Sequence, residues 1–303
     1  MARVAVVGVG AIGGALAGML ETAGGHRMSL CTRRPMPELT VQMAEETPRN
    51  KTQQIKMQKI KAQNWTAPSQ AQPVDWVLVA TKAYDAEATA QWLPRLCAEG
   101  APVAVIQNGV EHRQRFAPYL GPERLLPVVI DCPVERTPDG VVLVRGPALM
   151  KVEDSSLGSG FAALFKGSNV AIELVDDFTT AVWWKLCVNS VGALSALALR
   201  PSGILRGQAM SQLALEMVAE TVAVARAEGA HLNDSLCQEV LALYRKHPPD
   251  SVNSLLADRL TGRRTEWDAR NAAIVRYGEK HRIPTPLNRM AATLLEAAEA
   301  KSL

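Results

Sequence analysis

The sequence predicts an α/β domain with a parallel sheet, followed by an all-α domain. A glycine-rich loop near the N-terminus lies between an apolar run and a helical repeat. Apolar runs of strand length then alternate with helical segments, and beyond Asp176 every segment has helical periodicity. A length of 303 residues is typical of about two domains, so we predict domains at 1–175 and 176–303.

Composition argues against several classes of protein. Apolar residues make up 48% of the chain and charged residues 21%, which is typical of a globular protein and not of a disordered one. The net charge of +3 is too small to indicate a nucleic-acid or membrane partner. The five cysteines form no CxxC pair, which argues against a metal site or a disulfide framework and favours a reducing cytoplasm.

The first element is a strand over residues 4–7, followed by GVGAIG at residues 8–13 and then by a helix. A GxGxxG loop in this context is typical of a Rossmann-type dinucleotide site, where glycines admit the pyrophosphate to the helix N-terminus. The alternative interpretation of residues 1–23 is a signal peptide, and no other stretch approaches the length needed to span a bilayer. The predicted cofactor contacts in the loop are Gly8, Gly10, Ala11, Ile12 and Gly13.

The end of the second strand, over residues 26–31, indicates which cofactor is used. An acidic residue at this position would bind the ribose 2′-hydroxyl of NAD, and here Arg33 and Arg34 follow instead. Guanidinium groups suit a 2′-phosphate, which they hold by paired hydrogen bonds. The sequence therefore predicts NADP(H) over NAD(H), the alternative being a solvated basic loop.

Residues 36–72 are rich in proline and lysine. We predict short edge strands at residues 55–57 and 60–62, because their lysines discourage pairing with another sheet edge. A nucleic-acid patch is the alternative to such a solvated edge.

Two further core strands are predicted at residues 74–80 and 101–106, each followed by a helix. Lys82 and Asn108 come just after these strands. Because the carboxyl ends of parallel strands meet at one edge, both residues are expected on the same rim as the glycine loop. Alone each would be an ordinary loop residue, and the shared edge makes both candidates for the site.

From residue 125 to residue 175 the pattern changes to short strands, with a hairpin turn at residues 138–140 between the first two. We predict an antiparallel extension that completes the first domain. Its predicted strands are 126–130, 141–144, 149–152 and 170–174, with a helix at 161–166.

The second half of the chain is predicted to be helical, with prolines and a glycine between the segments. Its apolar C-terminal helices either pack internally or pair with a second subunit, so a homodimer is compatible with the pattern. The predicted helices are 179–199, 213–228, 234–244, 251–260, 265–281 and 287–300.

Polar residues of the helical half form a candidate site. Lys185 and Asn189 share one helix face, because they are four residues apart. Lys185 either snorkels from a helix boundary or stands in a cleft as a proton donor. Glu266 follows Thr265, a candidate helix cap, and serves either the helix dipole or the same site as Ser254 and Lys185. Periodicity does not choose between these interpretations.

In their order and spacing these motifs resemble the ketopantoate reductase (2-dehydropantoate 2-reductase) family, from Gly8 to about Asn288. The resemblance implies a Rossmann domain followed by an all-α, 6-phosphogluconate-dehydrogenase-like domain, with NADPH as hydride donor and a small 2-keto acid as substrate. The motifs that carry it are the glycine loop with arginine after the second strand, Thr81-Lys82, Gln107-Asn108-Gly109, Trp184-Lys185-Leu186 with Asn189, Asn253-Ser254 with Asp258, Thr265-Glu266 and residues 284–288.

The resemblance also implies roles for individual residues. Lys185 would be the general acid, and Glu266 would position the lysine and the substrate. Hydride addition to a ketone builds negative charge on oxygen, which an ammonium group stabilises and then protonates. Lys82 and Asn108 would lie between cofactor and substrate. The substrate-binding residues that the resemblance implies are Asn108, Asn189 and Ser254.

The chain departs from the family pattern at three places. Where the family has a second asparagine one helical turn after Asn189, this chain has Val-Gly-Ala-Leu at residues 191–194. Ser202 replaces a further asparagine and is included among the substrate-binding candidates, and Ala272 replaces a helical glycine. An unsupplied hydrogen bond to a polar substrate costs about 1–3 kcal/mol. The hydride chemistry is therefore better supported than the choice of ketopantoate.

The leading hypothesis is NADPH-dependent reduction of ketopantoate to pantoate in pantothenate (coenzyme A) biosynthesis, by a cytoplasmic enzyme that needs no metal. The missing asparagine favours the first alternative, a related hydroxyacid or opine-type dehydrogenase with another substrate. The second alternative is a non-catalytic NADPH-binding regulator, and the presence of both Lys185 and Glu266 argues against it.

Overall fold

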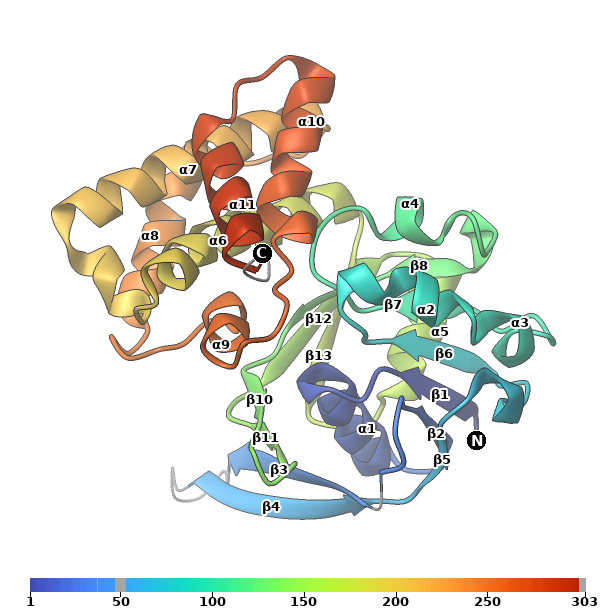
Figure 1. Cartoon of the computed structure of the whole chain (residues 1–303). Coiled ribbons are helices and arrows are strands. Elements are labelled where there is room, and N and C mark those ends of the chain that lie inside the picture. The colour runs from blue at the N-terminus through green and yellow to red at the C-terminus, as the bar shows by residue number, and fades with distance from the viewer. Residues whose placement is uncertain (37, 47–52, 300–303) are drawn as a thin grey trace. The chain divides into compact units, whose positions relative to one another are not determined.

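The computed structural model describes residues 1–36, 38–46 and 53–299 (Figure 1). The chain divides into two compact units. The first comprises Met1–Gln107 and His112–Asp176, and the second comprises Asn108–Glu111 and the chain from Asp177 onward. A four-residue segment that follows a strand of the first unit is thus part of the second unit, which chain order alone does not indicate.

The first unit is built on a six-stranded sheet in the order β5-β2-β1-β6-β7-β8. Every neighbouring pair in this sheet is parallel. The chain begins in the middle, builds outward to β5 and then returns to the other side of β1, so the order reverses between β1 and β6. Ligands of such sheets bind at this point, beyond the carboxyl ends of the strands. The strands are β1 (Arg3–Val7), β2 (Arg27–Cys31), β5 (Ala62–Trp65), β6 (Trp76–Val79), β7 (Val103–Val105) and β8 (Leu125–Pro127).

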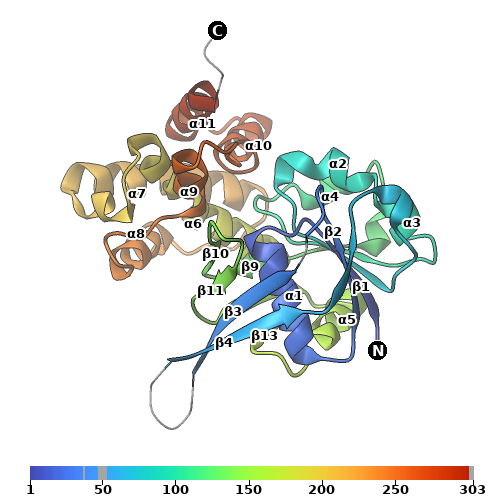
Figure 2. The ribbon, with the colours of Figure 1, turned by 60° about the horizontal axis from the view of Figure 1, so that its bottom comes forward.

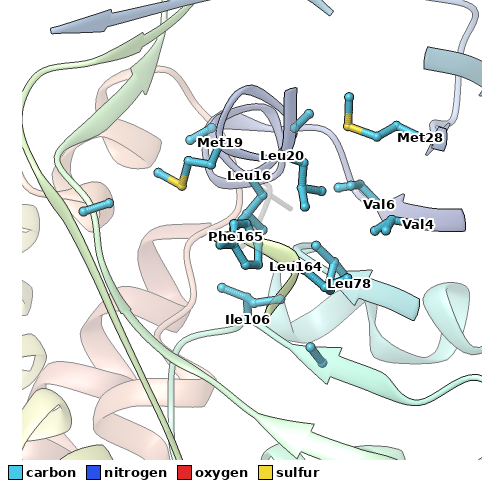
Figure 3. Close-up of a cluster of buried hydrophobic side chains, with 14 of the residues drawn as sticks. Val4, Val6, Leu16, Met19, Leu20, Met28, Leu78, Ile106, Leu164 and Phe165 are labelled. Atoms are coloured by element: carbon cyan, nitrogen blue, oxygen red, sulfur yellow. The ribbon is translucent and has the colours of Figure 1, made fainter. Parts of the chain in front are cut away.

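Alternating side chains of the parallel strands supply two separate apolar clusters. In β1, Val4 and Val6 pack with Leu16 of helix α1 on one face (Figure 3). Ala5 and Val7 belong to a cluster on the other face. Both faces are therefore covered by helices, so the fold is doubly wound, and the predicted α/β domain with a parallel sheet is confirmed. The helices are α1 (Ala11–Ala23) and α5 (Ser156–Leu164) on the first face, with α2 (Ala86–Ala90), α3 (Leu93–Leu96) and α4 (His112–Phe116) on the second.

A second sheet packs against α1 in the order β10-β11-β3-β4 (Figure 2). Two glycines of α1 allow this close approach. A Cβ atom on Gly14 would lie 2.5 Å from Val142, and one on Gly18 would lie 2.8 Å from Val41. The strands are β3 (Leu39–Glu46), β4 (Gln53–Ile60), β10 (Val134–Arg136) and β11 (Val142–Val144).

The region between β8 and the helical unit differs from the prediction. The antiparallel extension is wrong in two respects. β8 is the sixth strand of the parallel sheet, and β12 pairs parallel to β13 although antiparallel to β9. The hairpin turn at residues 138–140 joins β10 to β11, and does not follow the predicted strand 126–130 directly. The prediction missed β10 because this strand has only three residues. The third sheet consists of β9 (Val129–Asp131), β12 (Ala148–Glu153) and β13 (Val170–Val175).

The first predicted edge strand, residues 55–57, lies within β4 at the edge of the second sheet. The second, residues 60–62, was misplaced, because it spans the end of β4, a break at residue 61 and the first residue of β5, which is the edge strand of the parallel sheet. Strand β3 was missed. The short 3₁₀ helices of the first unit are Pro68–Gln70, Ala83–Asp85 and Pro122–Arg124.

The second unit consists of helices and the loops between them, with no strand among its described residues, as predicted. Helix α6 is at its centre and packs against α7, α9 and α11 (Figure 1). The main helices are α6 (Phe178–Ala198), α7 (Gln208–Ala227), α8 (Leu236–Lys246), α9 (Ser254–Leu260), α10 (Ala273–His281) and α11 (Pro286–Glu299). A 3₁₀ helix, η4 (Ser202–Arg206), and a π-helical segment, η5 (Asp268–Ala272), complete the unit.

By length and composition α6 is apolar enough to cross a membrane. The expectation that no stretch beyond residues 1–23 approaches the length needed to span a bilayer was therefore wrong. Most of its apolar stretch is buried inside the unit. Carbonyl groups of α6 also accept hydrogen bonds from side chains of other elements, at Val188 from Tyr244 (2.9 Å) and at Ser190 from Asn271 (3.2 Å). These contacts are those of the core helix of a globular unit.

Candidate active site

The predicted dinucleotide loop is a close-packed turn between β1 and α1. Gly8 has a φ of +89°, and a Cβ atom there would lie 2.5 Å from Cγ2 of Thr81. A Cβ atom on Gly13 would lie 2.0 Å from the carbonyl oxygen of Gly8. Gly10, by contrast, is exposed, and nothing lies within 4 Å of the place its Cβ would take. The loop therefore packs tightly on the protein side and is open at Gly10, which fits a bound diphosphate.

Helix α1 begins at Ala11, directly after the open glycine, and Ile12 follows in its first turn. The backbone N–H groups of the first turn have no partners within a helix, so this turn is suited to an anion. The sequence-predicted loop residues thus lie together at one helix N-terminus.

The loop after β2 carries the two predicted arginines. Thr32 donates to the carbonyl of Arg34 at 2.7 Å and accepts from Asn64 of β5 at 2.8 Å, which fixes the chain as it leaves the strand. Arg33 and Arg34 are both exposed, and Arg33 forms an ion pair with Asp85. Two exposed guanidinium groups at the end of β2 fit the phosphate of NADP.

The loops after β6 and β7 are joined by the amide of Gln107. Its Nε2 donates to Oγ1 of Thr81 at 3.1 Å and to the carbonyl of Lys82 at 3.3 Å. The carbonyl of Gln107 in turn contacts Nε2 of His112 at 2.8 Å. Lys82, which is half-buried, is thereby held on the rim that also carries the glycine loop.

In the second unit, Asn108 links two residues that the sequence places far apart. Its Nδ2 donates to Oε2 of Glu266 at 3.0 Å, and its Oδ1 accepts from Nδ2 of Asn189 at 3.3 Å. Glu266 is only 3% exposed, whereas both asparagines are half-buried. The adjoining Gly109 has a φ of +97°, and a Cβ there would lie 2.5 Å from the carbonyl of Ala269. The segment 108–111 is thus packed closely against the chain that carries Glu266.

Lys185 lies on α6 one turn before Asn189 and is half-buried like it. The shared face predicted from their spacing is therefore the partly covered face that Asn108 contacts through Asn189. A lysine in such a place has access to a small ligand, while the helix beneath it is fixed by the core of the unit.

The interpretation of Thr265 as a helix cap was wrong. Thr265 is buried, its backbone N–H donates to Oε1 of Glu299 at 2.6 Å, and its hydroxyl has no partner. The π-helical segment begins only at Asp268, so Thr265 lies too far ahead of it to cap its N–H groups. Glu266 is likewise buried against Asn108, and does not stand in solvent at a helix terminus.

Ser254 is the exposed first residue of α9. Asn253 caps this helix, accepting from the N–H of Leu256 at 3.0 Å, and donates to the carbonyl of Gly192 on α6 at 3.2 Å. An amide therefore lies beside the stretch 191–194, where the resemblance implies an asparagine that this chain lacks. This contact anchors α9, and with it Ser254, to the helix that carries Lys185.

Sequence reasoning missed Arg270, which donates from Nη2 to Oγ of Ser254 at 2.8 Å. Arg270 is 3% exposed. Burial lowers its pKa, and the negative charges of Glu266 and of two further groups oppose this. The available signal was its place four residues after Glu266 in the predicted helix 265–281, where the two residues would share one face.

Ser202 lies in η4 and is buried, with its backbone N–H donating to the carbonyl of Ser251 at 3.0 Å. Among the described residues no hydrogen bond joins it to Glu266 or to Asn108. The structure therefore brings together Asn108, Asn189 and Glu266, and separately Ser254 with Arg270, while Ser202 stands apart from both groups.

Comparison with known proteins relates both units to one family. Two family models match the chain in succession, "Ketopantoate reductase PanE/ApbA" over residues 4–156 and "Ketopantoate reductase PanE/ApbA C terminal" over residues 177–299. The chain is 43% identical to the 2-dehydropantoate 2-reductase of Caulobacter vibrioides, over 98% of this chain and 99% of that one.

Solved structures share the fold over almost the whole chain. The PanE/ApbA family ketopantoate reductase of Ralstonia eutropha JMP134 is 31% identical and covers 98% of both chains with a TM-score of 0.85. The dimeric ketopantoate reductase of Staphylococcus aureus is 22% identical and also covers 98% of both chains, with a TM-score of 0.81. The predicted fold class is confirmed by these matches.

Proposed function

This chain belongs to the ketopantoate reductase family, and on that premise we propose that it reduces 2-dehydropantoate to pantoate with NADPH as the hydride donor. The observation in this structure that carries the proposal is the buried carboxylate of Glu266, held by Asn108, which also accepts from Asn189 one turn after Lys185. The site thus combines a buried carboxylate, amide groups that hydrogen-bond and a lysine on the same helix face as Asn189. These are the groups that a site needs to bind a polar substrate and to give it a proton.

The glycine loop and the segments after β2, β6 and β7 would hold the cofactor. NADPH, when bound there, supplies the hydride that adds to the keto carbon. The open position at Gly10 leaves room for the diphosphate, and the exposed arginines suit the 2′-phosphate. The residues that we assign to the cofactor are Gly8, Gly10, Ala11, Ile12, Gly13, Arg33, Arg34, Lys82 and Asn108.

We assign the general acid to Lys185. As the new C–H bond forms at the keto carbon, the π bond of the carbonyl breaks and its electrons move to oxygen. The Nζ group of Lys185 stabilises this negative charge and then gives its proton to that oxygen, which leaves the alcohol and a neutral amine. The half-buried place of Lys185 strengthens the interaction relative to that in bulk water.

Glu266 is proposed as a positioning residue for Lys185 and the substrate. The amide of Asn108 donates a hydrogen bond to its buried carboxylate, so the position of the negative charge is fixed. A fixed negative charge attracts the ammonium group of Lys185 and so helps to orient it toward the substrate. We assign the substrate's polar groups to Asn108, Asn189 and Ser254, which supply neutral hydrogen-bond donors, and leave out Ser202, which is buried apart from them.

We also propose that the protein is cytoplasmic and forms a homodimer. All five cysteines are free, which is compatible with a reducing compartment, and the family's reaction is biosynthetic. The ketopantoate reductase of Staphylococcus aureus, which shares the fold, is dimeric. The molecular mass of the purified protein, measured by sedimentation, would test the proposed homodimer directly.

Steady-state oxidation of NADPH with a panel of 2-keto acids tests the proposed substrate. The informative comparison is 3-methyl-2-oxobutanoate, which lacks only the hydroxymethyl group of 2-dehydropantoate. We expect kcat/KM to be higher for 2-dehydropantoate by roughly 10-fold or more, because one unsatisfied hydrogen bond costs about 1–3 kcal/mol. A preference for another acid would instead favour a related hydroxyacid or opine-type dehydrogenase, and cofactor binding without turnover would favour a regulator.

A further inference from the structure

An arginine of the second sheet contacts the glycine loop at residues 8–13. Arg136 is the last residue of β10, and its Nη1 donates to the carbonyl of Val9 at 2.7 Å. Val9 lies between the first two glycines of the loop, and 127 positions separate it from Arg136. The loop is therefore in contact with a sheet that does not belong to the strand-loop-helix motif itself.

The register of the β10–β11 hairpin explains why Arg136 lies beside the loop. Arg136 is paired with Val142 of β11, and the side chains of directly paired residues point to the same face of a sheet. Val142 packs against α1, since a Cβ atom on Gly14 would lie 2.5 Å from its Cγ2. Arg136 is therefore on the face of the second sheet that covers α1, at the end where this helix begins.

Two hydrogen bonds hold the guanidinium group in place. Its Nε donates to the carbonyl of Gly140 in the hairpin turn at 3.2 Å, and its Nη1 donates to Val9. Both acceptors are neutral. Glu135, the neighbouring carboxylate, points to the opposite face of β10 and pairs with Arg145. Arg136 is exposed and forms no ion pair within the described part of the chain, so its charge and its remaining N–H donors are accessible to a ligand.

A positive charge at this place suits a diphosphate. Residues 8–13 carry no charged side chain, so the loop itself offers only backbone N–H groups and the partial positive charge of a helix N-terminus. A guanidinium group adds a full charge and can donate two parallel hydrogen bonds to a phosphate. Arg136 brings this group next to Gly10, the position at which the loop is open.

We propose that Arg136 is a further cofactor-binding residue, which fixes the glycine loop through Val9 and pairs with the diphosphate of NADPH. The inference rests on the proposed function for its choice of cofactor. The role differs from that of Arg33 and Arg34, which are assigned to the 2′-phosphate. Because NADPH and NADH share the diphosphate, Arg136 contributes to the affinity for both and not to the choice between them.

Binding titrations of the full-length protein with three compounds test this role. Arg136→Met keeps much of the aliphatic side chain and removes the guanidinium. We expect its dissociation constants for NADPH and NADH to rise by the same factor, roughly 10- to 100-fold, as for the loss of one charged hydrogen bond. Adenosine 2′-monophosphate has the adenine and the 2′-phosphate but no diphosphate, so its dissociation constant should stay within about threefold of the wild-type value. The melting temperature of the free variant should change little, because Arg136 is exposed.

Arg145→Met is the matched control. It removes an exposed arginine directly after β11 whose ion pair with Glu135 lies on the other face, and exposed ion pairs contribute little to stability. It should change none of the three dissociation constants. In Arg136→Met, an equal loss for adenosine 2′-monophosphate, a loss confined to NADPH, or dinucleotide affinities within about threefold of wild type would each overturn the proposal. Failure of the proposed function is a separate result, because it would appear as a wild-type protein that binds NADPH but reduces no 2-keto acid.

Discussion

Asn108 donates from Nδ2 to Oε2 of Glu266 across 3.0 Å, although 158 positions separate the two residues in the chain. The bond lies within the second unit, because residues 108–111 belong to it while the strand before them belongs to the first. Glu266 is 3% exposed, so its carboxylate has exchanged water for this amide. The orientation of the acid is therefore set by a residue that follows a strand of the α/β unit.

This relationship predicts that Asn108 and Glu266 act as one group. Glu266→Gln and Asn108→Ala should each lower kcat, because the first removes the buried charge that Asn108 orients and the second removes the amide that donates to Glu266. Their combination should cost less than the sum of the single effects, with a coupling of about 0.5–3 kcal/mol in a double-mutant cycle on kcat/KM. Glu296→Gln, at an exposed position of α11, serves as the control. Additive losses would contradict the assignment of Glu266 as a residue positioned by Asn108.

Replacement of Lys185 tests the proton transfer. Lys185→Met keeps the aliphatic part of the side chain and removes the ammonium, so it should lower kcat by roughly 10²- to 10⁴-fold, the usual contribution of a general acid. The dissociation constant for NADPH, measured by fluorescence titration, should stay within about threefold of the wild-type value. Lys246→Met, at the exposed end of α8, should leave both quantities unchanged. A kcat within about threefold of wild type would remove Lys185 from the mechanism.

The two faces of the glycine loop predict different effects for the same substitution. A Cβ on Gly13 would lie 2.0 Å from the carbonyl of Gly8, so Gly13→Ala should lower both the melting temperature and the affinity for NADPH. Nothing lies within 4 Å of the place that a Cβ on Gly10 would take. Gly10→Ala should therefore weaken NADPH binding while the melting temperature of the free protein changes little. A large loss of melting temperature in Gly10→Ala would contradict this division of roles.

Local patterns predicted most of the fold because its central elements are long or strongly apolar. The loop at residues 8–13 is recognisable because strand, glycines and helix follow one another without a gap. Strands β3 and β10 were missed, since one lies in a polar, proline-flanked region and the other has only three residues. Pairing direction also escaped prediction: β12 is parallel to one neighbour and antiparallel to the other, which no single-strand pattern encodes.

The site was predicted as a set of residues and not as a set of contacts. Lys185 and Asn189 were found together because helical spacing fixes their relationship. The hydrogen bond from Asn108 to Glu266 forms because residues 108–111 belong to the second unit, although the residues before and after them belong to the first. Local sequence patterns do not encode this long-range arrangement. Arg270 was overlooked because an arginine in a helical segment ordinarily faces solvent, and its burial is visible only in the packed unit.

The arginines after β2 predict the choice of cofactor. Removing both in Arg33→Ala/Arg34→Ala should raise the KM for NADPH by roughly 100-fold or more, since each charge-assisted hydrogen bond to a phosphate contributes about 1.5–3 kcal/mol. The KM for NADH should change little, because NADH has no 2′-phosphate. Arg27→Ala is a matched control at the exposed opposite end of the same strand. Comparable kcat/KM with both cofactors in the wild type would contradict the NADP(H) assignment.

Asp177 caps α6 and predicts a specific response to acid. Its carboxylate accepts from the hydroxyl and the backbone N–H of Thr180, at 2.6 and 2.8 Å, and contacts Nδ1 of His231 at 2.8 Å. The hydrogen bond from the Thr180 hydroxyl, followed by those from His231 and the Thr180 backbone, lowers the pKa of Asp177 from 3.8 to about 2. Because the pKa is lower in the folded state, the ionised form favours folding. The contribution to stability is present above the unfolded value and is lost as the pH falls from about 4 to about 2.

We therefore expect Asp177→Ala to lower the free energy of unfolding by about 1 kcal/mol at pH 7, the usual effect of removing a helix cap. The difference from wild type should shrink as the pH is lowered from about 4 toward about 2, because the wild-type carboxylate is then protonated too. The effect is moderate, since the Asp177 side chain is 40% exposed and solvent screens its charge. Urea unfolding across this pH range measures it, with Asp176→Asn, at the exposed neighbouring position, as the control. A difference that stays constant down to the lowest pH would show that Asp177 stabilises α6 without its charge.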